Sequence, residues 1–171
     1  MMAEAHLRVR LRPYADRDMW LLRRLLGDPA MTVHLGGPES NEAIVERHER
    51  YLASDGSNEE LFTVLAGPDQ IAAGWVGYWA THWRGEDVWE CGWHVLPEFQ
   101  GRGVATAAVN MLLEKVRERR TRAALYAFPS IDNVASNALC RTLGFHLIGQ
   151  TEVEYPKGST MRSNEWVMDL R

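Results

Sequence analysis

Cysteine is scarce in this sequence, where Cys91 and Cys140 are the only two among 171 residues. They form no C-x-x-C pair, and the six histidines are scattered without the spacing of metal ligands. A disulfide framework and a zinc site are therefore not indicated, and we expect no metal cofactor.

Basic residues are not in excess either. The chain has 19 Lys and Arg residues against 23 Asp and Glu residues, which gives a formal net charge of −4 at pH 7. A protein that binds nucleic acid without regard to its sequence needs a basic face. We therefore expect no nucleic-acid partner.

Long hydrophobic segments are missing as well. The longest nearly apolar run, residues 71–80, has about half the length that a bilayer span requires. The N-terminal stretch MMAEAHLRVR lacks the charged and then apolar pattern of a signal peptide. We expect a cytoplasmic protein that does not associate with membranes.

What is present is the composition of an ordinary globular domain, with 46% hydrophobic and 25% charged residues. A chain of this length is sufficient to bury a substantial core without covalent cross-links. No repeat, low-complexity tract or linker interrupts it. We predict one domain over residues 1–171.

Hydrophobic periodicity predicts a mixed α+β fold. Asp16 is expected to cap the first helix and Gly144 to end the last one. The expected strands cover residues 6–14, 61–66, 71–83, 88–96, 123–128, 146–155 and 164–170, and the expected helices cover residues 16–28, 44–55, 104–120 and 133–143. The second to fourth strands are predicted to form an antiparallel meander, and the fourth and fifth a βαβ unit with the helix between them.

The turn over residues 100–105 is the most informative segment. Glycines at 101 and 103 lead into a helix, whose first N–H groups and positive dipole end together favour an anion. No acidic residue occupies the first turn after Gly103, and Arg102 adds a cation. A tight turn that requires positive φ angles explains the two glycines equally well.

Two other phosphate-binding motifs fit this turn less well. A Rossmann dinucleotide site, which would make the protein an oxidoreductase, expects an acidic residue at the end of the next strand. That strand ends instead at Phe128 and Pro129. A P-loop requires G-K-[ST] after its glycines, and this sequence lacks it.

Read with its neighbours, the segment Gln100-Gly101-Arg102-Gly103-Val104-Ala105 resembles the Q/R-x-x-G-x-G/A signature of the GNAT superfamily of acyl-CoA-dependent N-acetyltransferases. Asn133, Ser136 and Leu139, followed by Gly144-Phe145, resemble a later helix that typically reads N-x-x-A/S-x-x-L-Y-x-x-x-G-F. The resemblance covers nearly the whole chain, because both motifs lie in order on the expected elements. The W-E-C-G-W stretch, together with Ser136-Asn137, looks most like the branch that includes ribosomal-protein-alanine N-acetyltransferases.

The resemblance implies the GNAT fold, in which a mostly antiparallel sheet of about seven strands splays around a βαβ acyl-CoA site, with about four helices. It implies acetyl-CoA as co-substrate, with the pyrophosphate bound by the turn and the pantetheine arm by the main chain of the preceding strand. The residues expected to bind acetyl-CoA are Val95, Gln100, Gly101, Arg102, Gly103, Val104, Ala105 and Asn133.

Acetyl transfer to an amine requires a deprotonated amine, a polarised carbonyl and a proton for the leaving thiolate. Glu90 is our candidate base, although a solvated or ion-paired carboxylate would look the same in the sequence. His94 has an intrinsic pKa better suited to a general base, but it lies beside Val95, where a structural or cofactor-neighbour role is expected.

For the acid, Cys140 stands where the family often has Tyr, and Ser136 lies one turn earlier on the same helix face. The alternatives are that Cys140 is a small buried residue and that Ser136 lets the cofactor approach closely. We expect direct transfer in a ternary complex, since neither cysteine lies in an obvious activating pair. The missing tyrosine favours the alternative of a non-catalytic acyl-CoA-binding regulatory module.

The acceptor is expected to be a primary amine, either a small molecule or a peptide N-terminus. His34, in a glycine-containing loop, and Trp79 and Trp93, on the strands, are the expected acceptor-binding residues. Tryptophans on sheets are commonly core residues, which is the competing interpretation. The sequence leaves the oligomeric state open and is compatible with a homodimer.

Overall fold

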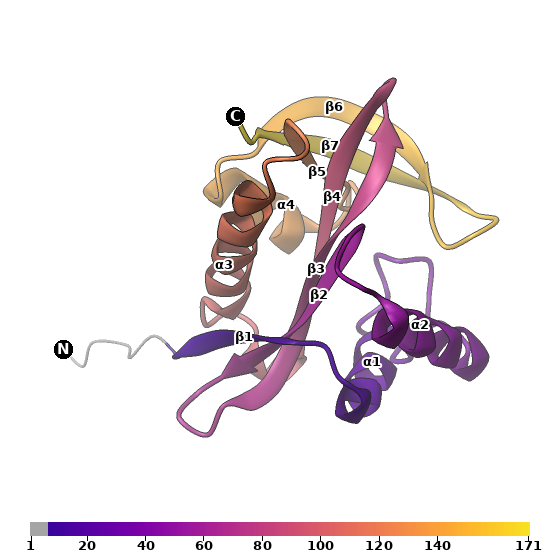
Figure 1. Ribbon diagram of the computed structural model, residues 1–171. Coiled ribbons are helices and arrows are strands. Elements are labelled where there is room, and N and C mark those ends of the chain that lie inside the picture. The colour runs from indigo at the N-terminus through magenta and orange to yellow at the C-terminus, as the bar shows by residue number, and fades with distance from the viewer. Residues whose placement is uncertain (1–6) are drawn as a thin grey trace.

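The computed structural model describes residues 7–171 and has its elements in the expected order (Figure 1). The helices are α1 (Met19–Leu26), α2 (Asn41–Ala53), α3 (Val104–Arg119) and α4 (Val134–Thr142), with 3₁₀ turns at Asp16–Asp18 and Pro97–Phe99. The strands are β1 (Val9–Pro13), β2 (Glu59–Ala66), β3 (Ile71–Trp83), β4 (Glu86–Val95), β5 (Ala124–Ala127), β6 (His146–Glu154) and β7 (Thr160–Asp169). The expected mixed α+β fold is confirmed. Residue 6, where we placed the start of the first strand, lies outside the described residues.

The seven strands form one sheet in the order β1-β2-β3-β4-β5-β7-β6. All neighbours are antiparallel except β4 and β5, which are parallel and are joined by α3. A tight turn reverses the direction of the chain and can join only antiparallel strands, so a parallel pair needs a longer crossover such as this helix. The expected meander and the βαβ unit are therefore both present.

The parallel pairing of β4 with β5 is very short. It consists of Trp89 opposite Leu125 and Glu90 opposite Tyr126, whereas β4 stays paired with β3 as far as Val95. From residue 91 onward, β4 has β3 on one side and no strand on the other among the described residues. The sheet therefore splays open after Glu90.

The helices cover both faces of the sheet, with α3 and α4 on one side and α1 and α2 on the other (Figure 1). Alternation along β3 divides its side chains between two cores. Val76 and Tyr78 pack in the core beneath α3, and Trp75 packs with leucines of α1 in the second core.

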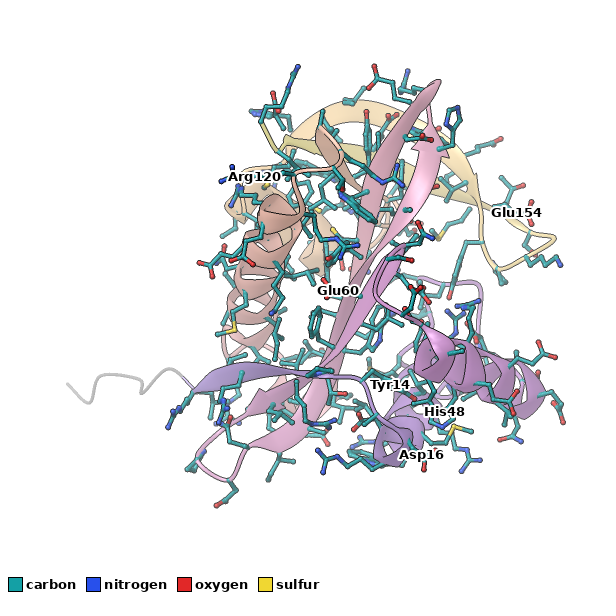
Figure 2. All side chains as sticks on the ribbon, viewed as in Figure 1. Tyr14, Asp16, His48, Glu60, Arg120 and Glu154 are labelled. Atoms are coloured by element: carbon teal, nitrogen blue, oxygen red, sulfur yellow. The ribbon has the colours of Figure 1, made fainter. Side chains whose placement is uncertain are left out.

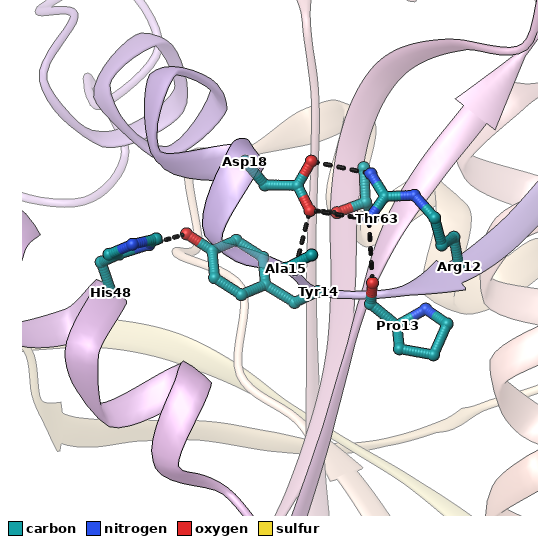
Figure 3. Close-up of polar contacts among 7 residues, drawn as sticks. All are labelled: Arg12, Pro13, Tyr14, Ala15, Asp18, His48 and Thr63. Atoms are coloured by element: carbon teal, nitrogen blue, oxygen red, sulfur yellow. Dashed lines mark hydrogen bonds and ion pairs between the residues drawn. The ribbon is translucent and has the colours of Figure 1, made fainter.

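A buried carboxylate anchors the start of α1 to the sheet (Figure 3). Asp18 accepts hydrogen bonds from Arg12 Nη2 at 2.8 Å and Nη1 at 3.0 Å, from Thr63 Oγ1 at 2.8 Å and from the Ala15 N–H at 2.9 Å. The expectation that Asp16 caps this helix is wrong, because the Asp16 side chain is 91% exposed and a 3₁₀ turn comes first. Asp18 directly precedes α1, and its carboxylate turns back to Arg12, Thr63 and Ala15 without accepting a hydrogen bond from an N–H group of the helix.

Within residues 7–171, no helix combines the length and the apolar character that crossing a membrane requires.

We expect Asp18→Ala to lower the free energy of unfolding by about 3 kcal/mol at pH 7, because it leaves the Arg12 charge unpaired. Burial pushes the pKa of Asp18 upward, but hydrogen bonds from Arg12, Thr63 and Ala15 outweigh burial and hold the pKa below its ordinary value. A lowered carboxyl pKa stabilises the fold above the unfolded value of about 3.9 and loses this effect as pH falls below it.

Urea denaturation at pH 7 and pH 3 measures both effects, and the difference between wild type and variant should shrink at the lower pH. Asp69→Ala, at an exposed turn, is the control and should stay within about 0.5 kcal/mol of wild type. Equal stabilities of the two variants at pH 7 would show that the Asp18 network contributes nothing.

Candidate functional site

A cavity of about 1210 Å³ lies where β4 and β5 separate. Its walls on one side come from β4, the end of β5 and the start of α4, and include Trp93, Asn133 and Ser136. On the other side it reaches under α1 and α2, where Tyr51 and Trp79 line it. The cavity thus connects the two faces of the sheet through the gap.

The backbone of β4 offers hydrogen-bonding groups to this gap. The Leu96 N–H donates to the Ala73 carbonyl at 2.8 Å, which fixes which residues of β4 pair with β3. Because pairing alternates in an antiparallel ladder, Cys91, Trp93 and Val95 direct their N–H and C=O groups away from β3, and of these groups the Val95 carbonyl already accepts a hydrogen bond from the Gln100 side chain. An extended polar chain can bind there as an added strand would.

The turn over residues 100–105 follows β4 and leads into α3. Gly101 and Gly103 have φ angles of 69° and 76°, and Gly103 is the N-cap of α3. Residues 101–103 are exposed, and the first N–H groups of the helix have no intrahelical partner. Gln100 Nε2 donates to the Val95 carbonyl at 2.9 Å, so this side chain ties the turn to the open edge of β4. None of residues 100–105 lines the cavity itself.

Glu90 lies at the point where the strands separate, opposite Trp79 on β3. Burial raises the pKa of its carboxyl group to about 7, and Trp79 partly opposes this shift. A carboxylate of this pKa takes up and releases a proton near neutral pH, as a general base must. Burial lowers the pKa of His94 to about 4, with Arg47 adding to the effect against Glu39, so its imidazole is neutral at pH 7.

The start of α4 places Ser136 and Asn133 on the cavity wall. Asn133 is the N-cap, and its side chain accepts the Ser136 N–H at 3.1 Å. Trp93 Nε1 donates to Ser136 Oγ at 3.3 Å. Trp93 therefore lies on the α4 side of the sheet, while Trp79 lies on the α1 and α2 side, and the structure does not bring these two expected acceptor residues together.

Cys140 is fully buried in the core beneath α3 and does not line the cavity. Burial raises the pKa of its thiol to about 12. Of the two expected acids, Ser136 is the one that reaches the cavity.

His34 lines the cavity from the loop between α1 and α2. The loop meets the turn between β6 and β7, because a Cβ atom on Gly36 would lie 3.0 Å from Pro156 Cδ. Tyr155, beside that proline, donates a hydrogen bond to Glu39 at 3.3 Å. The α1–α2 loop and the β6–β7 turn together close the cavity at the end that His34 and Tyr155 line.

Two groups of residues at the site were not anticipated from the sequence. Glu39 is paired with Arg47, which also donates to the Tyr51 hydroxyl at 3.2 Å. Asn137 is buried and makes four hydrogen bonds, donating to the Ser130 and Asn133 carbonyls and accepting from the Asn164 and Trp166 side chains. Asparagine is a weak helix former, so the position of Asn137 inside a predicted helix was the signal in the sequence that its side chain has a structural role.

In the part of the chain that the structure describes, no group of three His, Cys, Asp or Glu side chains is arranged to hold a metal ion.

A splayed sheet, a glycine turn at a helix start and a cavity between them define an acyl-CoA-type transferase fold. Residues 8–146 match the family model described as an acetyltransferase (GNAT) domain, and the chain belongs to this family. The family confirms the expected enzyme class, an acetyl-CoA-dependent N-acetyltransferase. A search among curated proteins finds no significant match.

Solved structures share this fold at low sequence identity. An acetyltransferase from Salmonella typhimurium that modifies the N-terminal serine of ribosomal protein L7/L12 superposes with a TM-score of 0.77 at 19% identity, over 98% of both chains. The spermidine N-acetyltransferase of Vibrio cholerae, solved with CoA and spermine, gives a TM-score of 0.76 at 17% identity over 95% of both chains. A GNAT-family acetyltransferase from Bacillus anthracis gives 0.74 at 17% identity over 95% of both chains.

Proposed function

We propose that this protein transfers the acetyl group of acetyl-CoA directly to a primary amine in a ternary complex. The observation that carries the proposal is the position of Glu90, whose carboxyl group lies where the cavity joins the two faces of the sheet. Burial there raises the pKa of this group to about 7. A base at that point reaches an amine that enters from the α1 and α2 side.

The cofactor side has the groups that coenzyme A requires. The pyrophosphate would bind the exposed N–H groups of residues 101–105 with Arg102 beside them. The pantetheine arm would pair with the open edge of β4 between Cys91 and Val95, facing Asn133 and Ser136. The relatives solved with CoA support this assignment.

The reaction needs the amine nitrogen to lose two protons and the sulfur to gain one. Glu90 takes the first proton from the ammonium group and releases it to water, and the free nitrogen lone pair attacks the thioester carbonyl carbon. As the carbon–sulfur bond breaks, the nitrogen releases its second proton to a water molecule, and the sulfur takes a proton from the Ser136 hydroxyl, which that water reprotonates. The contact from Trp93 to Ser136 orients that hydroxyl toward the gap.

Ligand-induced thermal stabilisation tests the proposal first. Acetyl-CoA and free coenzyme A, each at about a hundred times its dissociation constant, should stabilise the fold by about 2.7 kcal/mol, while NADH and ATP should not. Coenzyme A release is then followed with a panel of primary amines. Stabilisation without turnover on any amine would identify a non-catalytic binding module instead.

The glycine turn allows a matched pair of variants, Gly103→Asn and Gly103→Asp. Both side chains tolerate a positive φ, and no heavy atom lies within 4 Å of a Cβ atom there. The two variants differ in charge alone, so Asp should bind coenzyme A about tenfold more weakly than Asn does. Isothermal titration calorimetry measures this ratio, and equal affinities would place the pyrophosphate elsewhere.

Glu90→Gln should lower kcat/KM by about a hundredfold or more, because the base is lost. In the wild type the carboxylate form predominates above pH 7, so the rate should rise with pH and level off above that value. The variant should lose this limb and keep its affinity for coenzyme A. Glu86→Gln, at the exposed start of β4, is the control, and a pH profile shared by wild type and Glu90→Gln would remove Glu90 as the base.

A further inference from the structure

The acceptor half of the cavity has a floor of aromatic rings. Trp75 and Trp79 on β3 have ring centroids 6.3 Å apart and planes 30° apart. Tyr51 of α2 stacks on Trp75 at 5.7 Å with planes 11° apart. All three residues line the cavity, and we call them the indole floor. Trp75 and Tyr51 are only 5% and 8% exposed, so Trp79 presents the accessible ring and the other two support it from the core.

Two glycines make this floor possible. A Cβ atom on Gly92 would lie 3.0 Å from Cη2 of Trp79, and one on Gly77 would lie 2.8 Å from Cδ2 of Leu61 and 3.0 Å from Cζ2 of Trp75. Gly77 and Gly92 are directly opposite each other on β3 and β4, and neither has a positive φ angle. Their missing side chains therefore serve to let the rings lie against the strands.

The indole floor begins at the candidate base. Trp79 and Glu90 are direct cross-strand partners, so their side chains leave the same face of the sheet about 5 Å apart at Cβ. An amine whose nitrogen is within reach of Glu90 can therefore place the rest of its body against the Trp79 ring.

The cavity walls around this floor are acidic. Besides Glu90, the lining carboxylates are Asp55, Glu59, Glu152 and Glu154, the last on the strand that leads into the β6–β7 turn (Figure 2). Arg47 and Arg50 also line the cavity, but Glu39 pairs with Arg47. The excess of negative charge attracts a protonated amine and repels an acidic substrate.

We propose that the acceptor is a cationic primary amine joined by a short chain to a flat apolar or aromatic group, which lies on the indole floor. This inference rests on the proposed function. The same chemistry is offered by a free arylalkylamine and by a peptide whose first residue is aromatic. Polyamines and amino alcohols lack the flat apolar group, so they should be poorer acceptors.

The test compares 2-phenylethylamine with propylamine, which has the amine without the ring, and with spermidine. The wild type should use 2-phenylethylamine with a kcat/KM at least tenfold above that of propylamine. Trp79→Ala should reduce this ratio to near one, and Trp79→Phe should retain most of it. Any effect of Trp79 on Glu90 acts on both amines alike and cancels in the ratio.

Trp20→Ala is the matched control, because Trp20 is 44% exposed on α1 and does not line the cavity. It should leave the ratio unchanged. Gly92→Ala should lower the ratio as Trp79→Ala does, since the added methyl group displaces the Trp79 ring. Peptides that begin with Phe or Ser show whether the natural acceptor is a peptide or a free amine. If the peptide that begins with Phe has a higher kcat/KM than both the peptide that begins with Ser and 2-phenylethylamine, the floor binds peptide N-termini.

The inference is overturned if spermidine or propylamine is used as well as 2-phenylethylamine, or if Trp79→Ala leaves the ratio intact. Binding is measured separately, by quenching of tryptophan fluorescence when 2-phenylethylamine or propylamine is added to the protein saturated with coenzyme A. Should no amine be acetylated, the proposed function fails, and the difference in binding between these two amines still decides the inference.

Discussion

The two-residue contact between the parallel strands β4 and β5 is the constraint on which the rest of the site depends. Beyond Glu90 the sheet separates, and the edge of β4 remains paired on its β3 side. If β4 and β5 stayed paired over more residues, backbone hydrogen bonds would close the gap between them, and no cavity would connect the two faces of the sheet. The same separation places Glu90 at the branch point, where burial raises the pKa of its carboxyl group.

Polar networks hold the walls of the gap in place. Asn137 joins α4 to β7 and to the segment before α4, so the cavity wall at the start of α4 is attached to β7. Asp18 joins the start of α1 to β1 and β2, so the helices on the other face are attached to those two strands. Buried polar groups of this kind are costly unless they are fully paired, and paired they specify one arrangement. The two halves of the splayed sheet therefore keep their separate coverings.

The sequence predicted the order and type of the elements well, because periods of two and of three to four residues follow directly from strand and helix geometry. It also pointed to the glycine turn, since positive φ angles restrict residue choice. It could not separate Trp79 from Trp93, because the face that each occupies depends on strand register and on which helix covers that face. The contact of Tyr155 with Glu39 joins segments 116 residues apart, and no local pattern announces it. The pKa of Glu90 likewise depends on burial by distant elements.

Ser136 and Trp93 lie on one face of the sheet, and Trp79 lies on the other. This separation affects how substrates enter the cavity and how products leave it. If coenzyme A and the amine bind as proposed, they enter the cavity from opposite sides of one sheet, and neither occupies the entrance of the other. Coenzyme A would leave on the α4 side and the acetylated amine beneath α1 and α2, so the proposed arrangement would impose no fixed order of exchange.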